Sequence, residues 1–87
     1  MINVLVVDDH AIVRRGIVNI LSTEEDISVT GEASCYDELF ELLNKVQFDI
    51  VILDITMPGK NGLDTLIELR ELYRDMKVII LSMHSDE

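Results

Sequence analysis

The sequence predicts an α/β fold in which a parallel β-sheet is covered by helices on both faces. Short apolar runs recur along the chain, and a segment with apolar residues at helical spacing separates each run from the next. The runs are apolar almost throughout, which is typical of strands that are buried on both sides. Strands that alternate with helices in this way form parallel sheets.

Four segments are expected to be strands. The first, Ile2–Val7, reads INVLVV, and the last, Lys77–Leu81, reads KVIIL. Between them, Ile27–Ala33 (ISVTGEA) is rich in β-branched residues, and residues 49–53 read DIVIL. Because β-branched and aliphatic residues are favoured in strands, each run fits a short buried strand.

Three helices are expected between these strands. Residues 10–22 and residues 62–73 place apolar side chains at spacings of three and four. Ser34, whose hydroxyl is a favoured cap, is expected to cap the second helix, with Asp37 three residues later in the first turn. Apolar residues at helical spacing then continue to Val46.

The predicted order of elements is therefore β-α-β-α-β-α-β. Right-handed crossovers between parallel strands leave few topologies, and the simplest is a flavodoxin-like sheet with strand order 2-1-3-4. In such a sheet the functional site lies at the carboxyl ends of the strands, where the winding direction switches.

The length and composition of the chain limit its class. Its 87 residues form one small domain, and no apolar run is long enough to predict a membrane span or a signal peptide. A net charge of −10 argues against direct binding of nucleic acid. The single cysteine, Cys35, excludes an internal disulfide and fits a reducing cytoplasm. We therefore expect a soluble cytoplasmic protein.

Three carboxylates follow or end two strands that are neighbours in this order. Asp8 and Asp9 end the first strand, and Asp54 ends the third. Two carboxylates about 5 Å apart repel by about 3 kcal/mol at an effective dielectric constant near 20. Such a group either shares a proton or binds a cation, and oxygen ligands favour Mg²⁺ or Ca²⁺. Open positions for water and phosphate favour Mg²⁺.

Other polar groups are expected at the same edge of the sheet. Ser82 directly follows the fourth strand, and its hydroxyl is expected to face the carboxylates. The MPGKNG turn after Asp54 is expected to bring the backbone carbonyl of Thr56 close enough to bind a metal ion. His84 is interpreted as a loop residue.

This set of residues resembles the receiver domain of bacterial response regulators, the CheY-like module of two-component systems. The resemblance rests on Asp8-Asp9, Asp54, the MPG-x-x-G turn and Ser82, and it extends over the whole chain. The opening VLVVDDHAIVRRGI and the ending LSMHSDE are most similar to DNA-binding regulators of the NarL/LuxR type, whose output domain is a helix-turn-helix.

The resemblance implies a role for each site residue. Asp54 would accept a phosphoryl group from a histidine kinase, and Ser82 would act as the switch hydroxyl. Asp9, Asp54 and the carbonyl of Thr56 would bind Mg²⁺ directly, and Asp8 would bind it through water. The domain would be a regulatory phosphoacceptor and not an enzyme, apart from slow self-phosphorylation and self-dephosphorylation.

The chain also departs from the family pattern. Receiver domains have a fifth strand with a lysine that contacts the phosphoryl group, and two further helices; Lys45, Lys60 and Lys77 lie elsewhere in the pattern. Residues 1–87 are therefore interpreted as a truncated receiver with impaired switch output. Its fourth strand would be an open apolar edge, so we expect self-association through this strand or the uncovered sheet face.

Two other functions fit part of the pattern. A phosphatase of the haloacid-dehalogenase type also uses a strand-end aspartate and Mg²⁺, but it has an acid two residues later, where this chain has Thr56. A module that kept the fold for protein interaction without phosphorylation is the other alternative.

Overall fold

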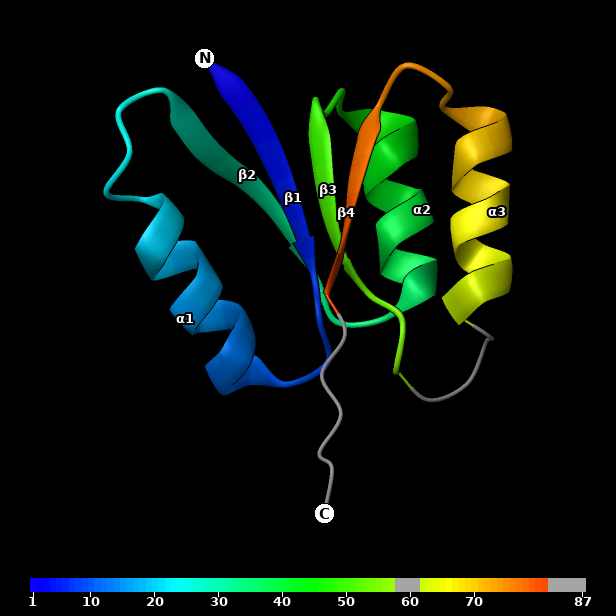
Figure 1. Cartoon of the computed structure of the whole chain (residues 1–87), viewed down its shortest axis with the longest axis horizontal. Helices are drawn as coiled ribbons and strands as arrows, with labels where there is room; N and C mark the ends of the chain where they lie inside the picture. The colour runs from blue at the N-terminus through cyan, green and yellow to red at the C-terminus, as the bar shows by residue number, and fades with distance from the viewer. Residues whose placement is uncertain (58–61, 82–87) are drawn as a thin grey trace.

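The computed structural model describes residues 1–57 and 62–81, and it contains the alternating elements that the sequence predicts (Figure 1). The elements are β1 (Ile2–Val7), α1 (Ala11–Leu21), β2 (Ile27–Ala33), α2 (Tyr36–Lys45), β3 (Ile50–Asp54), α3 (Gly62–Leu72) and β4 (Lys77–Leu81). The predicted boundaries of β1, β2 and β4 are confirmed. The helices are slightly shorter than predicted, and β3 is shifted by one residue, so Asp54 is the last residue of the strand.

The four strands form one parallel sheet in the order β2-β1-β3-β4, which confirms the predicted topology. In the register of the two central strands, Val7 of β1 lies opposite Leu53 of β3. Helix α1 lies on one side of the sheet, and α2 and α3 lie on the other (Figure 1). The fold is therefore a CheY-like arrangement in which β1 and β3 end side by side.

The hydrophobic core lies between the sheet and the pair of helices α2 and α3. Alternate residues of the central strands point into it, including Leu5, Val7, Val51 and Leu53, and all four are fully buried. This alternation is the period-two pattern of a strand, although both faces are apolar. Helix α1 has no buried residue, so the opposite face of the sheet is covered less completely.

The edge strand β4 keeps much of its apolar surface exposed. It pairs with β3 on one side, and 51% of Ile79 and 39% of Ile80 is accessible to solvent. Ile79 lies opposite Ile52 of β3, whereas α1 packs mainly over β1 and β2. Among the described residues, β4 thus has one free hydrogen-bonding edge and an apolar face.

The start of α2 corrects the prediction that Ser34 caps this helix. The N-cap residue is Cys35, in extended conformation and without a side-chain capping bond. The backbone N–H and the hydroxyl of Ser34 both donate to Glu38 Oε1, at 2.7 and 2.9 Å, and these bonds lower the pKa of Glu38. The helix thus starts one residue later than expected, and Ser34 donates to Glu38 from the position before the cap.

Within the described part of the chain, no helix has the length and apolar character that crossing a membrane requires.

Two glycines in helices are expected to respond in opposite directions to an added methyl group. A Cβ atom at Gly62 would lie 2.2 Å from the Ile55 carbonyl oxygen, and backbone atoms cannot turn aside as a side chain can. Gly16 has no atom within 4 Å of such a Cβ, on the exposed surface of α1. Gly62→Ala should therefore lower the free energy of unfolding by about 1–3 kcal/mol. Gly16→Ala should raise it by about 0.5–1 kcal/mol, because alanine favours the helix.

Urea unfolding followed by circular dichroism measures both changes. Equal destabilisation by the two substitutions would contradict the close packing of α3 against the segment after β3.

Candidate functional site

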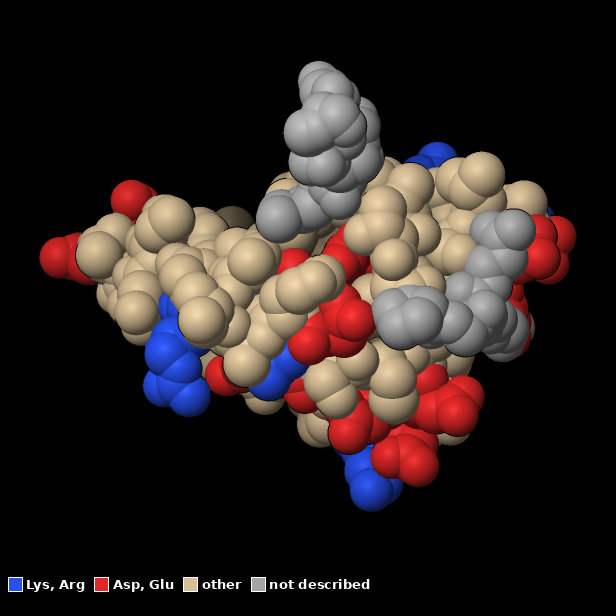
Figure 2. Space-filling model, turned by 90° about the horizontal axis from the view of Figure 1, so that it is seen from below, with Lys and Arg blue, Asp and Glu red and all other residues tan. Residues whose placement is uncertain are grey.

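The carboxyl ends of β1 and β3 bring the acidic residues together. Asp8 directly follows Val7, Asp54 directly follows Leu53, and Val7 and Leu53 are opposite each other in the sheet. Figure 2 views the molecule from this end, and acidic side chains lie near the middle of the face. Parallel pairing of two strands is thus sufficient to place carboxylates that are distant in sequence at one point.

Asp8 and Asp54 are fully buried, with no exposed surface. In each, the oxygen Oδ2 has no hydrogen-bond partner among the described residues. A buried polar atom without a partner costs about 1–3 kcal/mol, and more if it is charged. Two such oxygens at one place therefore form a site that favours a cation or another electron-poor ligand.

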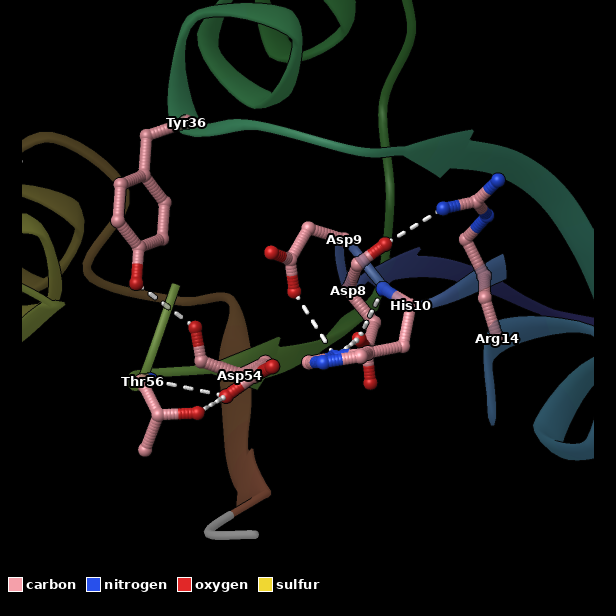
Figure 3. A network of polar contacts seen from close by, with 7 residues as sticks. All are labelled: Asp8, Asp9, His10, Arg14, Tyr36, Asp54 and Thr56. Carbon is pink, nitrogen blue, oxygen red and sulfur yellow. Dashed lines mark hydrogen bonds and ion pairs between the residues drawn. The ribbon is translucent and has the colours of Figure 1, made fainter. Parts of the chain in front are cut away.

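The other oxygen of Asp54 is held in place by Thr56. Oδ1 of Asp54 accepts a 2.8 Å hydrogen bond from the Thr56 backbone N–H and a 2.6 Å bond from its hydroxyl (Figure 3). Because both donors come from one residue, the carboxylate is fixed relative to the turn that follows β3. Oδ2 is the oxygen that has no hydrogen-bond partner among the described residues.

Tyr36, the first residue of α2, supports the same strand end. Its hydroxyl donates a 2.8 Å hydrogen bond to the backbone carbonyl of Asp54 (Figure 3). Burial raises the pKa of the Tyr36 phenol, and the nearby charges of Asp54 and Asp9 raise it further. The phenol is therefore protonated at neutral pH and acts as a donor. The sequence patterns identified Tyr36 only as an apolar helix residue.

His10 also belongs to the site. Its backbone N–H donates to Asp8 Oδ1 at 2.8 Å. Its ring nitrogen Nδ1 lies 3.2 Å from the same oxygen and 3.0 Å from Asp9 Oδ1 (Figure 3). The pattern of strand-end acids did not identify His10 as a site residue, although its position directly after two aspartates was an available signal.

Arg14 connects the site to helix α1 and strand β2. Its guanidinium donates to the backbone carbonyl of Asp8 (Figure 3) and, at 3.0 Å, to the carboxylate of Glu32. Arg14 contacts Asp8 through the backbone carbonyl and forms no ion pair with the Asp8 carboxylate. Arg14 therefore orients the segment after β1 without neutralising the Asp8 carboxylate directly.

The donor set fits a divalent metal ion. One ligand atom from each of Asp8, Asp9, His10 and Asp54 can be chosen so that all lie within 4.8 Å of one another. Oδ2 of Asp8 and Oδ2 of Asp54 are buried without a hydrogen-bond partner among the described residues, so the negative charge there would be stabilised by a bound cation. The carbonyl of Thr56 as a ligand stays a prediction. Ser82, His84, Pro58 and Gly59 lie outside the described residues.

The model of the family described as "Response regulator receiver domain" matches residues 4–87. The chain belongs to this family. Response regulator UvrY of Escherichia coli (strain K12) is 41% identical over 86 residues, covering 99% of this chain and 39% of UvrY. The nitrate/nitrite response regulator protein NarL of the same strain is 38% identical over 84 residues, covering 97% of this chain and 39% of NarL. The chain thus spans about two fifths of these relatives.

Solved receiver domains have the same fold as this chain. The isolated REC domain of RcsB from Salmonella enterica serovar Typhimurium, determined in the presence of phosphomimetic BeF3−, superimposes with a TM-score of 0.90 at 30% identity. The match covers 98% of this chain and 64% of that one. The receiver domain described here is therefore of the NarL/LuxR type, and domains of this family typically bind Mg²⁺ at acidic residues.

Replacing the buried phenol of this receiver domain should loosen the end of β3. Tyr36→Phe removes the hydroxyl that donates to Asp54 and should lower the free energy of unfolding by about 1–2 kcal/mol. Tyr73→Phe is the matched control, because the structure gives the Tyr73 hydroxyl no hydrogen bond among the described residues. Urea denaturation of the two variants measures the difference. Equal losses would argue against a stabilising role for the Tyr36–Asp54 bond.

Proposed function

We propose that this receiver domain accepts a phosphoryl group on Asp54 from a histidine kinase and thereby transmits a signal in a two-component system. The observation that carries the proposal is the state of the Asp54 carboxylate. One oxygen is fixed by Thr56, and the other is buried without a hydrogen-bond partner among the described residues. Histidine kinases are the partners of response regulators, and this chain belongs to that family.

In the proposed transfer, Oδ2 of Asp54 attacks the phosphorus atom in line with the bond from phosphorus to the kinase histidine. The new bond joins Oδ2 to phosphorus, and the imidazole of the kinase leaves with the electrons of the broken bond and takes up a proton. Thr56 holds Oδ1 of Asp54 with two hydrogen bonds, so only Oδ2 of this carboxylate is available to attack the phosphorus atom. Fixing a nucleophile in this way lowers the entropic cost of the reaction.

Mg²⁺ belongs to the same proposal. We assign its direct binding to Asp9, Asp54 and the carbonyl of Thr56, with Asp8 acting through water. When bound, the ion supplies neutralisation of the negative charge that gathers around a transferring phosphoryl group. Its binding would also relieve the repulsion between the carboxylates, whose Oδ1 atoms accept hydrogen bonds from the backbone N–H groups of His10 and Thr56. Ser82 would donate to a phosphoryl oxygen and act as the switch hydroxyl.

We infer a place for this domain in a longer protein. NarL and UvrY are response regulators, and the chain spans 39% of each. By similarity to these relatives, the phosphorylated domain would control transcription through a C-terminal helix-turn-helix in the cytoplasm. DNA contacts would come from that output domain, because the receiver itself carries a net charge of −10. The receiver would act as a regulatory phosphoacceptor and not as an enzyme.

Phosphorylation by a small donor tests the assignment of Asp54. With acetyl phosphate and Mg²⁺, we expect intact-protein mass spectrometry to show one added phosphoryl group on the wild-type chain. Asp54→Asn should abolish the adduct, because an amide is not nucleophilic. Asp9→Asn should slow its formation by at least about tenfold, because it weakens metal binding.

Asp37→Asn is the matched control, since Asp37 is an exposed acid in the first turn of α2. It should be phosphorylated at the wild-type rate. A wild-type chain that takes up no phosphoryl group, or an adduct that persists in Asp54→Asn, would overturn the proposal.

We also propose that the 87-residue chain self-associates through β4 and the sheet face next to it. Two isoleucines of this strand are substantially exposed, and its outer edge has no partner strand among the described residues. Exposed apolar edges of this kind pair with other chains. The occupant that best fits such an edge is the same edge of a second copy.

Light scattering coupled to size exclusion tests this association at micromolar concentration. We expect the wild-type chain to run as a dimer or larger, and Ile79→Lys to run as a monomer, because a charge cannot be buried at the new interface. Ile12→Lys is the control, since Ile12 is an exposed isoleucine of α1 at 88% accessibility. A wild-type chain that stays monomeric would refute the interface.

A further inference from the structure

His10 stands among the site residues but has no part in the proposed phosphoryl transfer. It is the member of the cluster that offers nitrogen instead of oxygen, and it lies on the segment that joins β1 to α1. Its side chain is 62% exposed, whereas those of Asp8 and Asp54 are fully buried. The ring lies beside the carboxylates of Asp8 and Asp9 (Figure 3).

The spacing of the donor atoms fits adjacent positions around one metal ion. Two ligands about 2.1 Å from an octahedral ion and at right angles to each other are about 3.0 Å apart. Nδ1 of His10 lies 3.0 Å from Asp9 Oδ1 and 3.2 Å from Asp8 Oδ1. In the metal-free site the same distances fit N–H···O contacts. An ion bound at this point would take the place of the Nδ1 proton, and the neutral ring would carry its proton on Nε2.

The buried oxygens provide an observation that is independent of the histidine. Oδ2 of Asp8 and Oδ2 of Asp54 have no hydrogen-bond partner among residues 1–57 and 62–81. They attract any divalent cation and do not distinguish strongly among them. A nitrogen ligand does distinguish, because Mg²⁺ prefers oxygen, whereas imidazole suits Ni²⁺, Cu²⁺ and Zn²⁺.

We propose that His10 is a metal-selectivity residue, whose Nδ1 binds a transition-metal ion such as Ni²⁺ in the site formed by Asp8, Asp9 and Asp54. The proposal rests on the proposed function, because both use the metal site formed by Asp8, Asp9 and Asp54. It adds that the nitrogen of His10 increases the preference of this site for Ni²⁺ over Mg²⁺. A site with the three carboxylates alone would have a smaller preference.

Calorimetric titration of tag-free protein with Ni²⁺ and with Mg²⁺ tests the selectivity. His10→Ala should weaken Ni²⁺ binding by about tenfold or more and change Mg²⁺ binding by less than about threefold. The chain's other histidine supplies the matched control: His84→Ala should leave both affinities unchanged. Equal weakening of Ni²⁺ and Mg²⁺ binding in His10→Ala, or loss of Ni²⁺ binding in His84→Ala, would overturn the proposal.

A spectroscopic measurement tests ligation itself. In the Mn²⁺-loaded protein, pulsed electron paramagnetic resonance should show coupling to one imidazole ¹⁴N nucleus, and His10→Ala should abolish it. Persistence of that coupling in His10→Ala would contradict the assignment.

Phosphorylation of the same variant separates this proposal from the preceding one. His10→Ala should still take up a phosphoryl group on Asp54 from acetyl phosphate with Mg²⁺. If it does so while the Ni²⁺ to Mg²⁺ preference equals that of the wild type, the selectivity role fails and the phosphoacceptor function stands. If the wild-type chain shows Ni²⁺ selectivity that depends on His10 but no phosphorylation, the function fails and the selectivity role stands.

Discussion

The parallel pairing of β1 with β3 is the constraint on which the rest of the site depends. This pairing places Val7 opposite Leu53, and each of these residues is followed by an aspartate that is fully buried. The hydrophobic burial of the two strands is strong enough to hold like charges near each other at the sheet edge. A site of this kind stores electrostatic repulsion that an added cation can release. Charge neutralisation is therefore the chemistry that the fold itself favours.

Two of the surrounding residues, Tyr36 and Arg14, contact the main chain of the acids and not their carboxylates. Tyr36 donates to the carbonyl of Asp54, and Arg14 donates to the carbonyl of Asp8. Both aspartates are thus positioned through their backbones, and neither acid forms an ion pair with an arginine or lysine among the described residues. A direct guanidinium partner would have neutralised a carboxylate that the proposed chemistry needs. Tyr36 and Arg14 therefore position Asp54 and Asp8 without neutralising their carboxylates.

The sequence was sufficient to predict the strands, their order and the convergence of Asp8, Asp9 and Asp54. Apolar runs and strand-end acids are local patterns, and the topology of a parallel sheet allows few alternatives. Tyr36 and Arg14 could not be identified in this way. Tyr36 fits a helical apolar pattern equally well as a core residue, and only the packing of α2 on the sheet directs its hydroxyl to Asp54.

The cap of α2 and the contacts of His10 could not be predicted from residue type either, although both depend on residues that are close in sequence. Ser34 has the residue type of a helix cap, but the bonds that Glu38 accepts from it leave Cys35 as the N-cap. His10 follows two acids in sequence, yet its ring could equally have pointed to solvent. The direction of a side chain depends on the backbone angles of the turn after β1, and residue type alone does not fix these angles.

The two sides of the site differ in how firmly they are held. Asp54 ends the strand that packs against the core shared with α2 and α3, whose residues are buried. Asp9 and His10 belong to the segment that leads into α1, a helix without a buried residue. A ligand that contacts Asp54 and Asp9 together therefore connects the packed core to the segment that leads into α1.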